Sequence, residues 1–396
     1  MKPTAILDIG SSKIVCLCGS AAIRGGTVVH GAGITDYSGY SEAEFHDTDD
    51  LEDAIIYAIR DAEEMARVRI RDIVLSVPGP FTKLILTDAS IRMESKRDRI
   101  SEEDIDELIS LSLSKAHAPG YALMHSTPVT FTLDGYKTSD VPQGQHAGEV
   151  STEVSHMYVR EDFLDLITKV LRRLSIEISM CVSAPLAESL LLIPEEERVR
   201  PSVLIDVGYT HTDISLIENS ALTALRTIDI GGYQFASDLS FGLDIPLDAA
   251  EQVKRKYTFL QEDESDTITI RMLTGVKTVE RSVVDYIMDA RANEFAGLLQ
   301  KELRAFGIRP EIRPVVYISG GGFVMMRGGA EFLRHHLEIN VRRDLPYMPD
   351  MDTPNFASAF AALDFIIRAA SQGQDETDFS GDNRKFTEKL RDLFIQ

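Results

Sequence analysis

The sequence lacks the features that mark membrane-spanning, secreted and nucleic-acid-binding proteins. Its longest apolar runs are well short of the ~20 residues that a spanning helix needs, and the opening segment MKPTAILDIG has no apolar stretch long enough for a signal peptide. We therefore expect no transmembrane segment and a cytosolic chain. Lys and Arg number 41 against 63 Asp and Glu, which gives a formal net charge of −22. Because phosphate groups and anionic lipids attract basic surfaces, this charge disfavours nucleic acid as a partner and general adhesion to membranes.

Cysteine and histidine patterns typical of disulfide-bonded or metal-binding proteins are missing as well. The three cysteines, Cys16, Cys18 and Cys181, fall in strand-like runs, and their odd number argues against a disulfide framework. The nine histidines include no HExxH pattern, and the adjacent pair His335 and His336 would point apart on a helix. We expect buried structural cysteines and no metal site built from protein side chains alone.

The chain is long enough for at least two domains. Hydrophobic residues make up 44% and charged residues 26% of its 396 residues, as in an ordinary globular protein. Strand-like and helix-like runs alternate along most of the sequence, but residues 83–162 differ. They predict a strand, a helix with Ser101 as N-cap and Asp104 three residues on, a hairpin that turns at Asp134–Gly135, and a further strand. We interpret them as an inserted α+β unit.

One pattern occurs twice. In AILDIGSSKIV (residues 5–15) and VLIDVGYTHTD (residues 203–213), an apolar run ends in an aspartate, one apolar residue and a glycine, and hydroxyl-bearing residues follow. The two aspartates, Asp8 and Asp206, lie 198 residues apart. Each copy predicts a strand, a tight turn and a second strand. We therefore expect two duplicated halves.

A strand that ends in Asp-x-Gly followed by hydroxyl residues suits a metal–phosphate site. Glycine lets the backbone approach a ligand closely, and the amides and hydroxyls of the turn can surround phosphate oxygens. The aspartate can reach a hydrated Mg²⁺, which binds proteins through few carboxylates together with substrate phosphates. Either hairpin alone is readily explained as an ordinary turn, but two of them on opposing halves would clamp the phosphates of one nucleotide.

A third element suits the other end of a nucleotide. Gly320–Gly322 follow a strand-like run in VVYISGGGFVMMRG, where glycines would let the main chain pack against a base or ribose. The alternative is an ordinary turn at the start of a helix. Glu251 and Lys254 lie at i and i+3 of a predicted helix and can face a ribose and a base. The alternative for Glu251 is a capping box with Asp248 as N-cap.

The segments LDIGSSK, LIDVGYTHTD and YISGGGFVMM resemble the phosphate 1, phosphate 2 and adenosine motifs of the actin-like ATPase superfamily, and the whole chain resembles the FtsA family of bacterial cell-division proteins. APLAES and PNFASAFAAL are similar to that family's two connecting helices, and GLDIPLDAAEQVKRKY to its adenosine-contacting helix. The resemblance implies an α/β actin-like fold, in which two duplicated ribonuclease-H-like halves surround a nucleotide cleft, plus an inserted α+β domain (IC). The boundaries it implies are 1–82, 163–185 and 347–370 for domain IA, 83–162 for domain IC, 186–235 and 306–346 for domain IIA, 236–305 for domain IIB, 371–383 for a flexible linker and 384–396 for an amphipathic membrane-targeting helix.

The resemblance also implies a set of site residues and ATP or ADP as the nucleotide. Asp8 and Asp206 would lie near Mg²⁺, directly or through water. Two positions depart from the family pattern: Tyr209 replaces a glycine of the second phosphate loop, and Ala184 stands where relatives often carry Gln or Glu. We therefore expect nucleotide binding with at most slow hydrolysis, and no catalytic residue is assigned. The nucleotide-contacting positions carried over from the family are Asp8, Gly10, Ser11, Ser12, Lys13, Asp206, Gly208, Thr210, His211, Glu251, Lys254, Gly320, Gly321 and Gly322.

The last residues of the sequence form an amphipathic pattern after the polar segment 371–383. On a helix, their apolar side chains would form one stripe, flanked by four basic residues against two acidic ones. This combination suits a helix that lies in the headgroup region of an anionic membrane. The alternative is a helix docked on the protein's own surface. The membrane-contacting residues are predicted to be Arg384, Lys385, Phe386, Lys389, Leu390, Arg391, Leu393 and Phe394.

The resemblance implies a function in cell division. It describes an ATP-binding actin-like protein that polymerises on the inner face of the cytoplasmic membrane, as a peripheral protein at the division septum. Its expected partners are copies of itself, partly through domain IC, the C-terminal peptide of the tubulin-like protein FtsZ in the Z-ring, later division proteins and anionic membrane. Three other classes share parts of the pattern: a PilM-like scaffold for pilus assembly, a sugar or acetate kinase, and a chaperone ATPase of the Hsp70 type. The amphipathic tail favours the division protein over the scaffold and the kinase. The chaperone is disfavoured because we expect no substrate-binding domain after residue 370.

Overall fold

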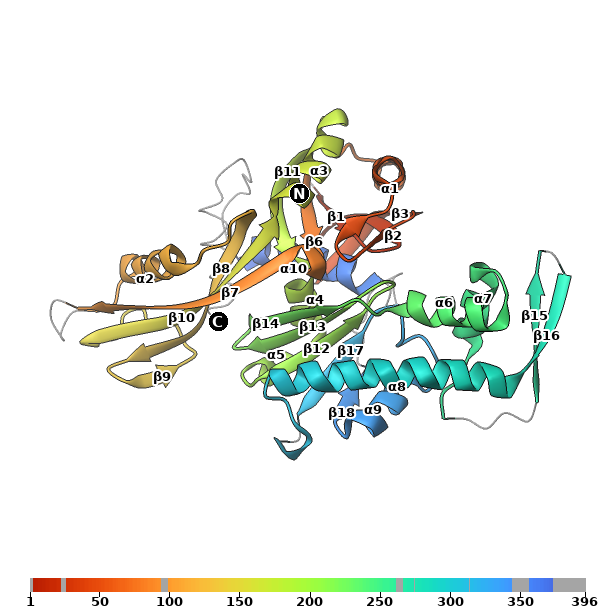
Figure 1. Cartoon of the computed structure of the whole chain (residues 1–396). Helices are drawn as coiled ribbons and strands as arrows, with labels where there is room; N and C mark the ends of the chain where they lie inside the picture. Colours follow the sequence, from red (N-terminus) through yellow and green to blue (C-terminus); the bar gives the residue numbers. More distant parts are fainter. Residues whose placement is uncertain are drawn as a thin grey trace.

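Two five-stranded sheets and a smaller four-stranded sheet organise the protein (Figure 1). The structure is a computed structural model, and it describes residues 3–22, 26–93, 99–260, 266–273, 275–312, 314–343 and 356–372. The predicted membrane-targeting helix lies outside these residues. Most of the predicted linker, residues 371–383, lies outside the described residues too. Only its first two residues are described, as the end of the helix α10 (Ala357–Gln372).

The first five-stranded sheet is built around the first Asp-x-Gly hairpin. Its strands, in spatial order, are β11 (Glu177–Ser183), β6 (Asp72–Val77), β1 (Thr4–Ile9), β2 (Lys13–Ala21) and β3 (Thr27–Asp36). β1 and β2 pair antiparallel with Asp8 opposite Val15, and β6 lies parallel to β1 on its other side. β6 ends before Pro78, since proline has no N–H to donate to a neighbouring strand.

The second five-stranded sheet repeats this topology. Its strands, in spatial order, are β18 (Asn340–Arg342), β17 (Val315–Ser319), β12 (Ser202–Val207), β13 (Thr212–Glu218) and β14 (Ala221–Ile228). β12 and β13 pair antiparallel with Asp206 opposite Asp213, and β17 lies parallel to β12. Adding 198 to the Asp8–Val15 pair of the first hairpin gives this Asp206–Asp213 pair, so the two hairpins share one register. The predicted duplication is confirmed.

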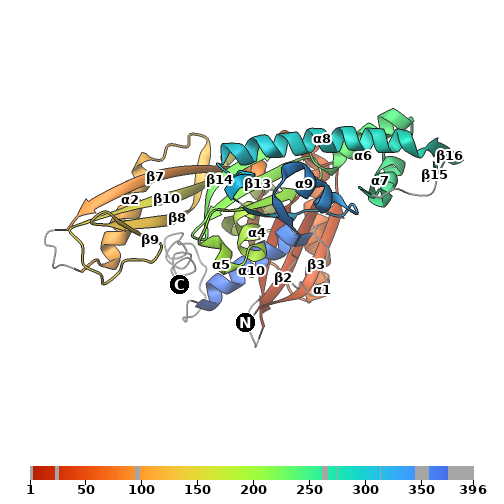
Figure 2. The same ribbon diagram turned by 90° about the horizontal axis from the view of Figure 1, so that it is seen from below.

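Two helices fill the space between the sheets (Figure 2). Phe360 of α10 packs in one apolar cluster with Ile6 of β1, on the first sheet. Leu186 of α4 (Ala184–Leu192) packs in another with Leu204 of β12, on the second sheet. α4 and α10 therefore connect the two cores and bring side chains close to the ends of β1 and β12.

Four helices cover the outer faces of the two sheets. The first sheet is covered by α1 (Thr48–Ala66) and α3 (Glu161–Arg173), with the short β4 (Tyr40–Ser41) and β5 (Glu44–Phe45) beside them. The second sheet is covered by α8 (Arg281–Ala305) and α9 (Gly329–Leu337). α6 (Gly232–Leu243) and α7 (Leu247–Lys256) pack against each other, and α6 against α8, beyond the end of the second sheet (Figure 1). The other described elements are α5 (Glu195–Arg198), the hairpin β15 (Thr267–Met272) and β16 (Gly275–Glu280), and the 3-10 turns Gly79–Phe81 and Pro310–Ile312.

The inserted unit is a four-stranded antiparallel sheet with one helix, and it extends away from the two larger sheets (Figure 1). Its elements are β7 (Thr82–Arg92), α2 (Glu102–Lys115), β8 (Tyr121–Leu133), β9 (Tyr136–Thr138) and β10 (Glu149–Arg160). The predicted N-cap is confirmed: the Ser101 backbone N–H donates to Asp104 Oδ2 at 2.7 Å, and the Asp104 N–H donates to Ser101 Oγ at 3.2 Å. Asp134 and Gly135 both adopt positive φ, at 46° and 91°, as the predicted tight turn requires.

Two further findings concern the described residues. None of the described helices has the length and apolar character needed to cross a membrane. The three cysteines are free thiols, of which Cys16 and Cys18 are buried in β2 and Cys181 is half-buried in β11. Their role is therefore to pack, as small apolar side chains do.

Candidate functional site

A cavity of about 450 Å³ lies where the two hairpins face each other. It brings together residues from β1, β12, α4, α7 and the loop after β17, which are far apart in the sequence. Of the predicted site residues, it is lined by Asp8, Gly10, Ser11, Ser12, Lys13, Asp206, Gly208, His211, Glu251, Lys254, Gly320, Gly321 and Gly322. Thr210 is not among the lining residues, and the predicted membrane-contacting residues, 384–394, lie outside the described part of the chain.

The two hairpin turns have the same internal geometry. The Gly10 N–H donates to the carbonyl oxygen of Lys13 at 3.0 Å, and the Gly208 N–H donates to that of His211 at 2.9 Å. Each turn therefore spans the same four positions and carries its aspartate at the end of the preceding strand. On the neighbouring parallel strands, Ser76 is the register partner of Asp8, and Ser319 is that of Asp206. The duplication extends to the polar groups around each aspartate.

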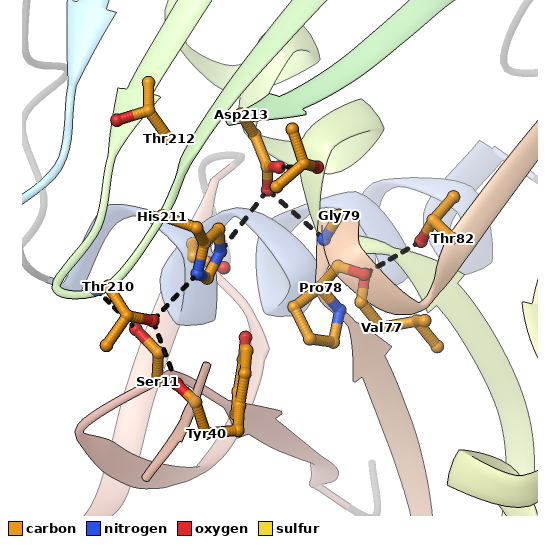
Figure 3. Close-up of polar contacts among 12 residues, drawn as sticks. Ser11, Tyr40, Val77, Pro78, Gly79, Thr82, Thr210, His211, Thr212 and Asp213 are labelled. Atoms are coloured by element: carbon orange, nitrogen blue, oxygen red, sulfur yellow. Dashed lines mark hydrogen bonds and ion pairs between the residues drawn. The ribbon is translucent and has the colours of Figure 1, made fainter. Parts of the chain in front are cut away.

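Thr210 joins the two turns directly (Figure 3). Its backbone N–H donates to Ser11 Oγ at 3.2 Å, and its hydroxyl donates to the carbonyl oxygen of Tyr40 at 2.9 Å. Thr210, Ser11 and Tyr40 are all buried. Thr210, which was predicted to lie around phosphates, contacts the opposing half of the protein here and fixes the distance between the hairpins.

Asp213, on β13, makes a second contact between the halves (Figure 3). Its Oδ2 accepts a hydrogen bond from the Gly79 N–H at 3.2 Å, and its Oδ1 accepts one from the Thr227 hydroxyl at 2.5 Å. Gly79 lies in the turn between β6 and β7, through which the inserted unit is attached. Asp213 therefore links the cavity to the base of that unit.

Several acidic side chains converge in the cavity and perturb one another. Burial, followed by the charges of Asp213 and Asp8, raises the pKa of Asp206 to about 7. Burial raises the pKa of Asp213 to about 7 as well, against the hydrogen bonds from Thr227 and Gly79. The pKa of Asp8 is also raised by burial, although the Ser358 hydroxyl of α10, 3.0 Å from Oδ1, and the Lys13 charge oppose the shift. A cation in this cavity would relieve the repulsion.

His211 is neutral at physiological pH. Burial lowers its pKa to about 4, and its ring stacks on Tyr40 with 5.6 Å between ring centroids. His211 Nε2 lies 3.7 Å from Asp213 Oδ2, but an uncharged imidazole forms no ion pair at this distance. His211 forms part of the cavity wall beside Asp213.

The loop after β17 needs its glycines because three backbone segments meet there. Gly320 has φ of 90°, and a Cβ on it would lie 2.3 Å from Asp206 Oδ1. A Cβ on Gly322 would lie 2.0 Å from the carbonyl oxygen of Gly208, while its N–H donates to the carbonyl oxygen of Val207 at 2.8 Å. The alternative in which these glycines start a helix is wrong, since α9 begins at Gly329.

Glu251 and Lys254 form an ion pair on α7 at the edge of the cavity. Lys254 Nζ lies 2.7 Å from Glu251 Oε2 and donates to the carbonyl oxygen of Gly232 at 3.0 Å. Burial lowers the pKa of Lys254, and the Glu251 charge opposes this shift. The capping-box alternative for Glu251 is wrong, because α7 begins two residues earlier than it requires, with Pro246 as N-cap in place of Asp248.

Tyr209 fits the second turn without strain. It has no positive φ, so a side chain is tolerated where relatives carry glycine, and its ring packs edge-on against Tyr233 with 5.5 Å between centroids. Sequence reasoning missed several residues that line the cavity, among them Tyr40, Glu188, Asp213 and Ser358. Glu188 carries the one recognisable signal, a charged residue within the apolar helix APLAESLLL.

The described residues suit a hydrated metal better than a dedicated metal cage. In the part of the chain that the structure describes, no three His, Cys, Asp or Glu side chains are placed to hold a metal ion. Mg²⁺ needs fewer protein ligands than that, because phosphate oxygens and water complete its octahedron. Asp8 and Asp206 both line the cavity and provide such a small donor set once they are deprotonated.

Solved structures with the same architecture define the class of protein. The PilM–PilN type IV pilus biogenesis complex aligns with a TM-score of 0.62 and 18% identity, over 91% of this chain and 97% of that one. MreB5 of Spiroplasma citri bound to ADP aligns with a TM-score of 0.55 and 11% identity, over 94% of this chain and 99% of that one. At these identities the likeness is one of fold: the protein has the actin-like nucleotide-binding fold.

Sequence comparisons define the family within this class. The family model described as cell division protein FtsA matches residues 203–361, and that for the SHS2 domain inserted in FtsA matches residues 82–158. The cell division protein FtsA of Neisseria meningitidis serogroup B is 25% identical over 369 residues, which cover 91% of this chain and 89% of the relative. The chain belongs to the FtsA family of cell-division proteins, as its motifs predicted.

Proposed function

We propose that this protein binds Mg-ATP between its duplicated hairpins, polymerises on the inner face of the cytoplasmic membrane and tethers FtsZ there during septum assembly. The observation that carries the proposal is the pair of hairpins with one register and one turn geometry, facing each other across a single cavity. Membership of a cell-division family supports the cellular role.

The nucleotide would lie with its phosphates between the two turns. The Ser11 and Ser12 hydroxyls, with the backbone N–H groups of both turns, would donate to phosphate oxygens, and Lys13 would balance their charge. Bound Mg²⁺ would neutralise phosphate charge next to Asp8 and Asp206. The solved MreB5 structure, which shares this fold, contains ADP, and that supports a nucleotide ligand here.

The other end of the cavity suits the nucleoside. Glycine backbone at Gly320–Gly322 leaves room for a flat ring to approach the main chain, and Glu251 and Lys254 present a carboxylate and an ammonium group within reach of ribose hydroxyls and base nitrogens. Nucleotide contact with both sheets at once would hold the two halves at a fixed separation. A fixed separation would favour one subunit geometry, and hence a polymer.

The predicted tail helix would supply the membrane contact. Four apolar side chains, at ~1.5–3 kcal/mol each for full burial, give an upper bound of roughly 6–12 kcal/mol. Ordering the helix and incomplete burial reduce this greatly, so one tail should bind weakly and reversibly. A row of tails on a polymer would bind far more tightly through effective concentration. Membrane attachment and self-assembly therefore depend on each other in this proposal.

Liposome co-sedimentation tests the proposal. We expect the full chain to pellet with anionic vesicles, more strongly with Mg-ATP, and to carry added FtsZ with it, whereas a chain that ends at Asp382 stays in the supernatant. Leu390→Glu should abolish pelleting, because it places a charge on the apolar stripe. Ile395→Glu is the matched control, since it adds the same charge on the helix face opposite the stripe. Equal behaviour of the full and shortened chains would refute membrane tethering.

The fold likeness to the PilM–PilN complex favours a second candidate, a scaffold for pilus assembly. The same protein distinguishes the two functions by its partner. Binding of the FtsZ C-terminal peptide supports the division role, and binding of a pilus membrane-protein peptide in its place supports the scaffold.

A further inference from the structure

A second cavity, of about 340 Å³, lies in the second half of the protein, where the first turns of α9 meet the end of β18. Its charged lining residues are Arg327, Arg334, Arg342, Arg343 and Glu331, and we call it the arginine pocket. The chain as a whole has a formal net charge of −22, so four arginines around one hollow are a local reversal of its charge. Positive charge concentrated in this way attracts anions.

Contacts with the protein hold two of these arginines in place. Arg334, on α9, donates through Nη2 to the carbonyl oxygen of Val341 on β18 at 2.8 Å. Arg342 Nη1 lies 2.8 Å from Glu197 Oε1 on α5. Glu197 balances the charge of Arg342, whereas a carbonyl oxygen carries no net charge to balance that of Arg334. Both guanidinium groups are therefore oriented before any ligand binds, which lowers the entropy cost of binding.

The other two arginines have no such contacts. In the part of the chain that the structure describes, the side chains of Arg327 and Arg343 form no hydrogen bond or ion pair, and both are exposed. Glu331 also lines the pocket, and its charge offsets only a part of the positive total. Like charges held near one another repel, and an anion placed among them replaces this repulsion by attraction.

One wall of the pocket is main chain that is anchored on an aromatic core. Gly328 lines the pocket with φ of 77°, and a Cβ on it would lie 2.4 Å from the carbonyl oxygen of Phe259. The Phe259 N–H donates to the carbonyl oxygen of Arg327 at 2.8 Å. The Phe259 ring packs against that of Phe332 on α9, with 5.0 Å between centroids. The loop that carries Arg327 is therefore fixed at the base of α9.

The donors of the arginine pocket fit a phosphate group. A guanidinium presents its N–H groups as a planar fork and binds carboxylate or phosphate oxygens in pairs. A carboxylate offers two oxygens, whereas a terminal phosphate offers three and can accept from several arginines at once. The volume of the pocket is that of a site for a small ligand.

We propose that the arginine pocket binds a terminal phosphate group, at a site separate from the nucleotide cavity between the hairpins. None of the four arginines lines the nucleotide cavity, and Met326 is the residue of the loop before α9 that lines both. The inference goes beyond the proposed function and does not depend on it, because the arginine pocket shares no acidic residue or hairpin turn with the nucleotide cavity.

Calorimetric titration of inorganic pyrophosphate into the full chain tests the inference, with EDTA present. Without a divalent cation, the acidic residues of the nucleotide cavity repel pyrophosphate, so the titration measures binding to the arginines. We expect Arg327→Gln and Arg343→Gln each to raise Kd at least about threefold, and the double variant to raise it at least about tenfold. Arg304→Gln is the matched control, because it removes an exposed arginine of α8 that lines neither cavity. Thermal unfolding shows that each variant is folded before its Kd is compared.

Two further titrations locate the ligand and define its chemistry. Lys13→Gln removes a cation from the nucleotide cavity, and it should leave the Kd for pyrophosphate unchanged. Citrate, whose anionic groups are all carboxylates, should bind at least about tenfold more weakly than pyrophosphate.

The full chain with Leu390→Glu distinguishes a soluble phosphate from a lipid headgroup, because it is expected to lack membrane binding by the tail. We expect it to bind pyrophosphate and to stay in the supernatant with vesicles of phosphatidylcholine and phosphatidic acid, which assigns the phosphate to a soluble molecule. If it pellets, and Arg327→Gln with Arg343→Gln releases it, the phosphate belongs to a lipid headgroup.

Three results would overturn the inference. The first is no binding of pyrophosphate, or a Kd that neither arginine substitution changes. The second is weaker binding to Lys13→Gln alone, which would place pyrophosphate between the hairpins. The third is equal affinity for citrate, which would make the pocket a general anion site. ATP takes no part in these titrations, so a protein that binds pyrophosphate at the arginines but fails to bind Mg-ATP would refute the proposed function and leave this inference standing.

Discussion

Replacing Asp213 by Asn should make the stability of the nucleotide-free protein less dependent on pH. The pKa of Asp213 is about 7 in the folded protein, against 3.8 for an ordinary aspartate. Between these values the folded state keeps a proton that the unfolded state has released. The stability that comes from this proton is complete below pH 3.8 and is lost as the pH rises through about 7. Asn cannot titrate, so the variant lacks this loss.

The magnitude follows from linkage. One proton retained only by the folded state lowers the free energy of unfolding by about 1.4 kcal/mol for each pH unit of increase, or roughly 4 kcal/mol over the whole interval. This is an upper bound, because Asp206 and Asp8 adjust their own protonation when Asp213 is neutral. Asn retains the geometry: its carbonyl can accept from Gly79, and its amide can donate to Thr227 Oγ1.

Urea unfolding at several pH values from 5.5 to 8 measures the effect, with Asp53→Asn as the control. Asp53 is exposed on α1, so its replacement removes the same charge from the surface. We expect the stability curve of Asp213→Asn to be flatter than that of the wild type and to cross above it toward pH 8. Parallel curves for the wild type and both variants would refute the argument that Asp213 is held protonated by burial.

Three other predictions follow from local geometry and linkage. Gly322→Ala should unfold at a lower urea concentration than the wild type and bind ATP poorly, because its Cβ would lie 2.0 Å from the carbonyl oxygen of Gly208. Gly297→Ala on α8 is the control: its Cβ would meet open space, and it should stabilise the protein by up to about 1 kcal/mol. Ser101→Ala should cost about 1 kcal/mol in urea unfolding, because α2 loses its capping box with Asp104. In thermal unfolding, Mg-ATP at 100 times its Kd should raise the free energy of unfolding by about 2.7 kcal/mol. At one fixed Mg-ATP concentration, this stabilisation should be larger at pH 8 than at pH 6, because the deprotonated acids attract the cation.

The hairpins and their pairing could be predicted because their signal is local and repeated. An apolar run, Asp-x-Gly and a tight turn determine the strand ends by themselves, and two copies suggest two halves. The capping-box alternative for Glu251 placed the start of α7 too late, because Asp248 is a good N-cap by type but the helix already begins after Pro246. Predictions from propensity alone are weakest at such boundaries.

The residues that complete the cavity depend on packing that no local pattern records. Asp213 occupies a position in the strand TDISLIE where an alternating pattern permits a polar residue, so it looks like an ordinary solvent-facing position. It faces the cavity only because the turn at Gly79 closes over it from the first half of the chain. Ser358 likewise reaches Asp8 from a helix 350 residues away in sequence. Contacts of this kind follow from the relative placement of two domains.

The acidic residues and the contacts between the halves have opposite effects on the cleft. Asp8 comes from the first sheet and Asp206 from the second, so their charges repel across the cavity, and burial strengthens this repulsion because few water molecules screen it. Thr210 and Asp213 hold the halves together through hydrogen bonds at the edge of the same cavity. A bound cation with its phosphates would convert the repulsion into attraction toward a common centre. The repulsion in the empty cavity opposes these hydrogen bonds, whereas the bound ligand would reinforce them. Nucleotide binding would therefore change directly how firmly the two halves are held together.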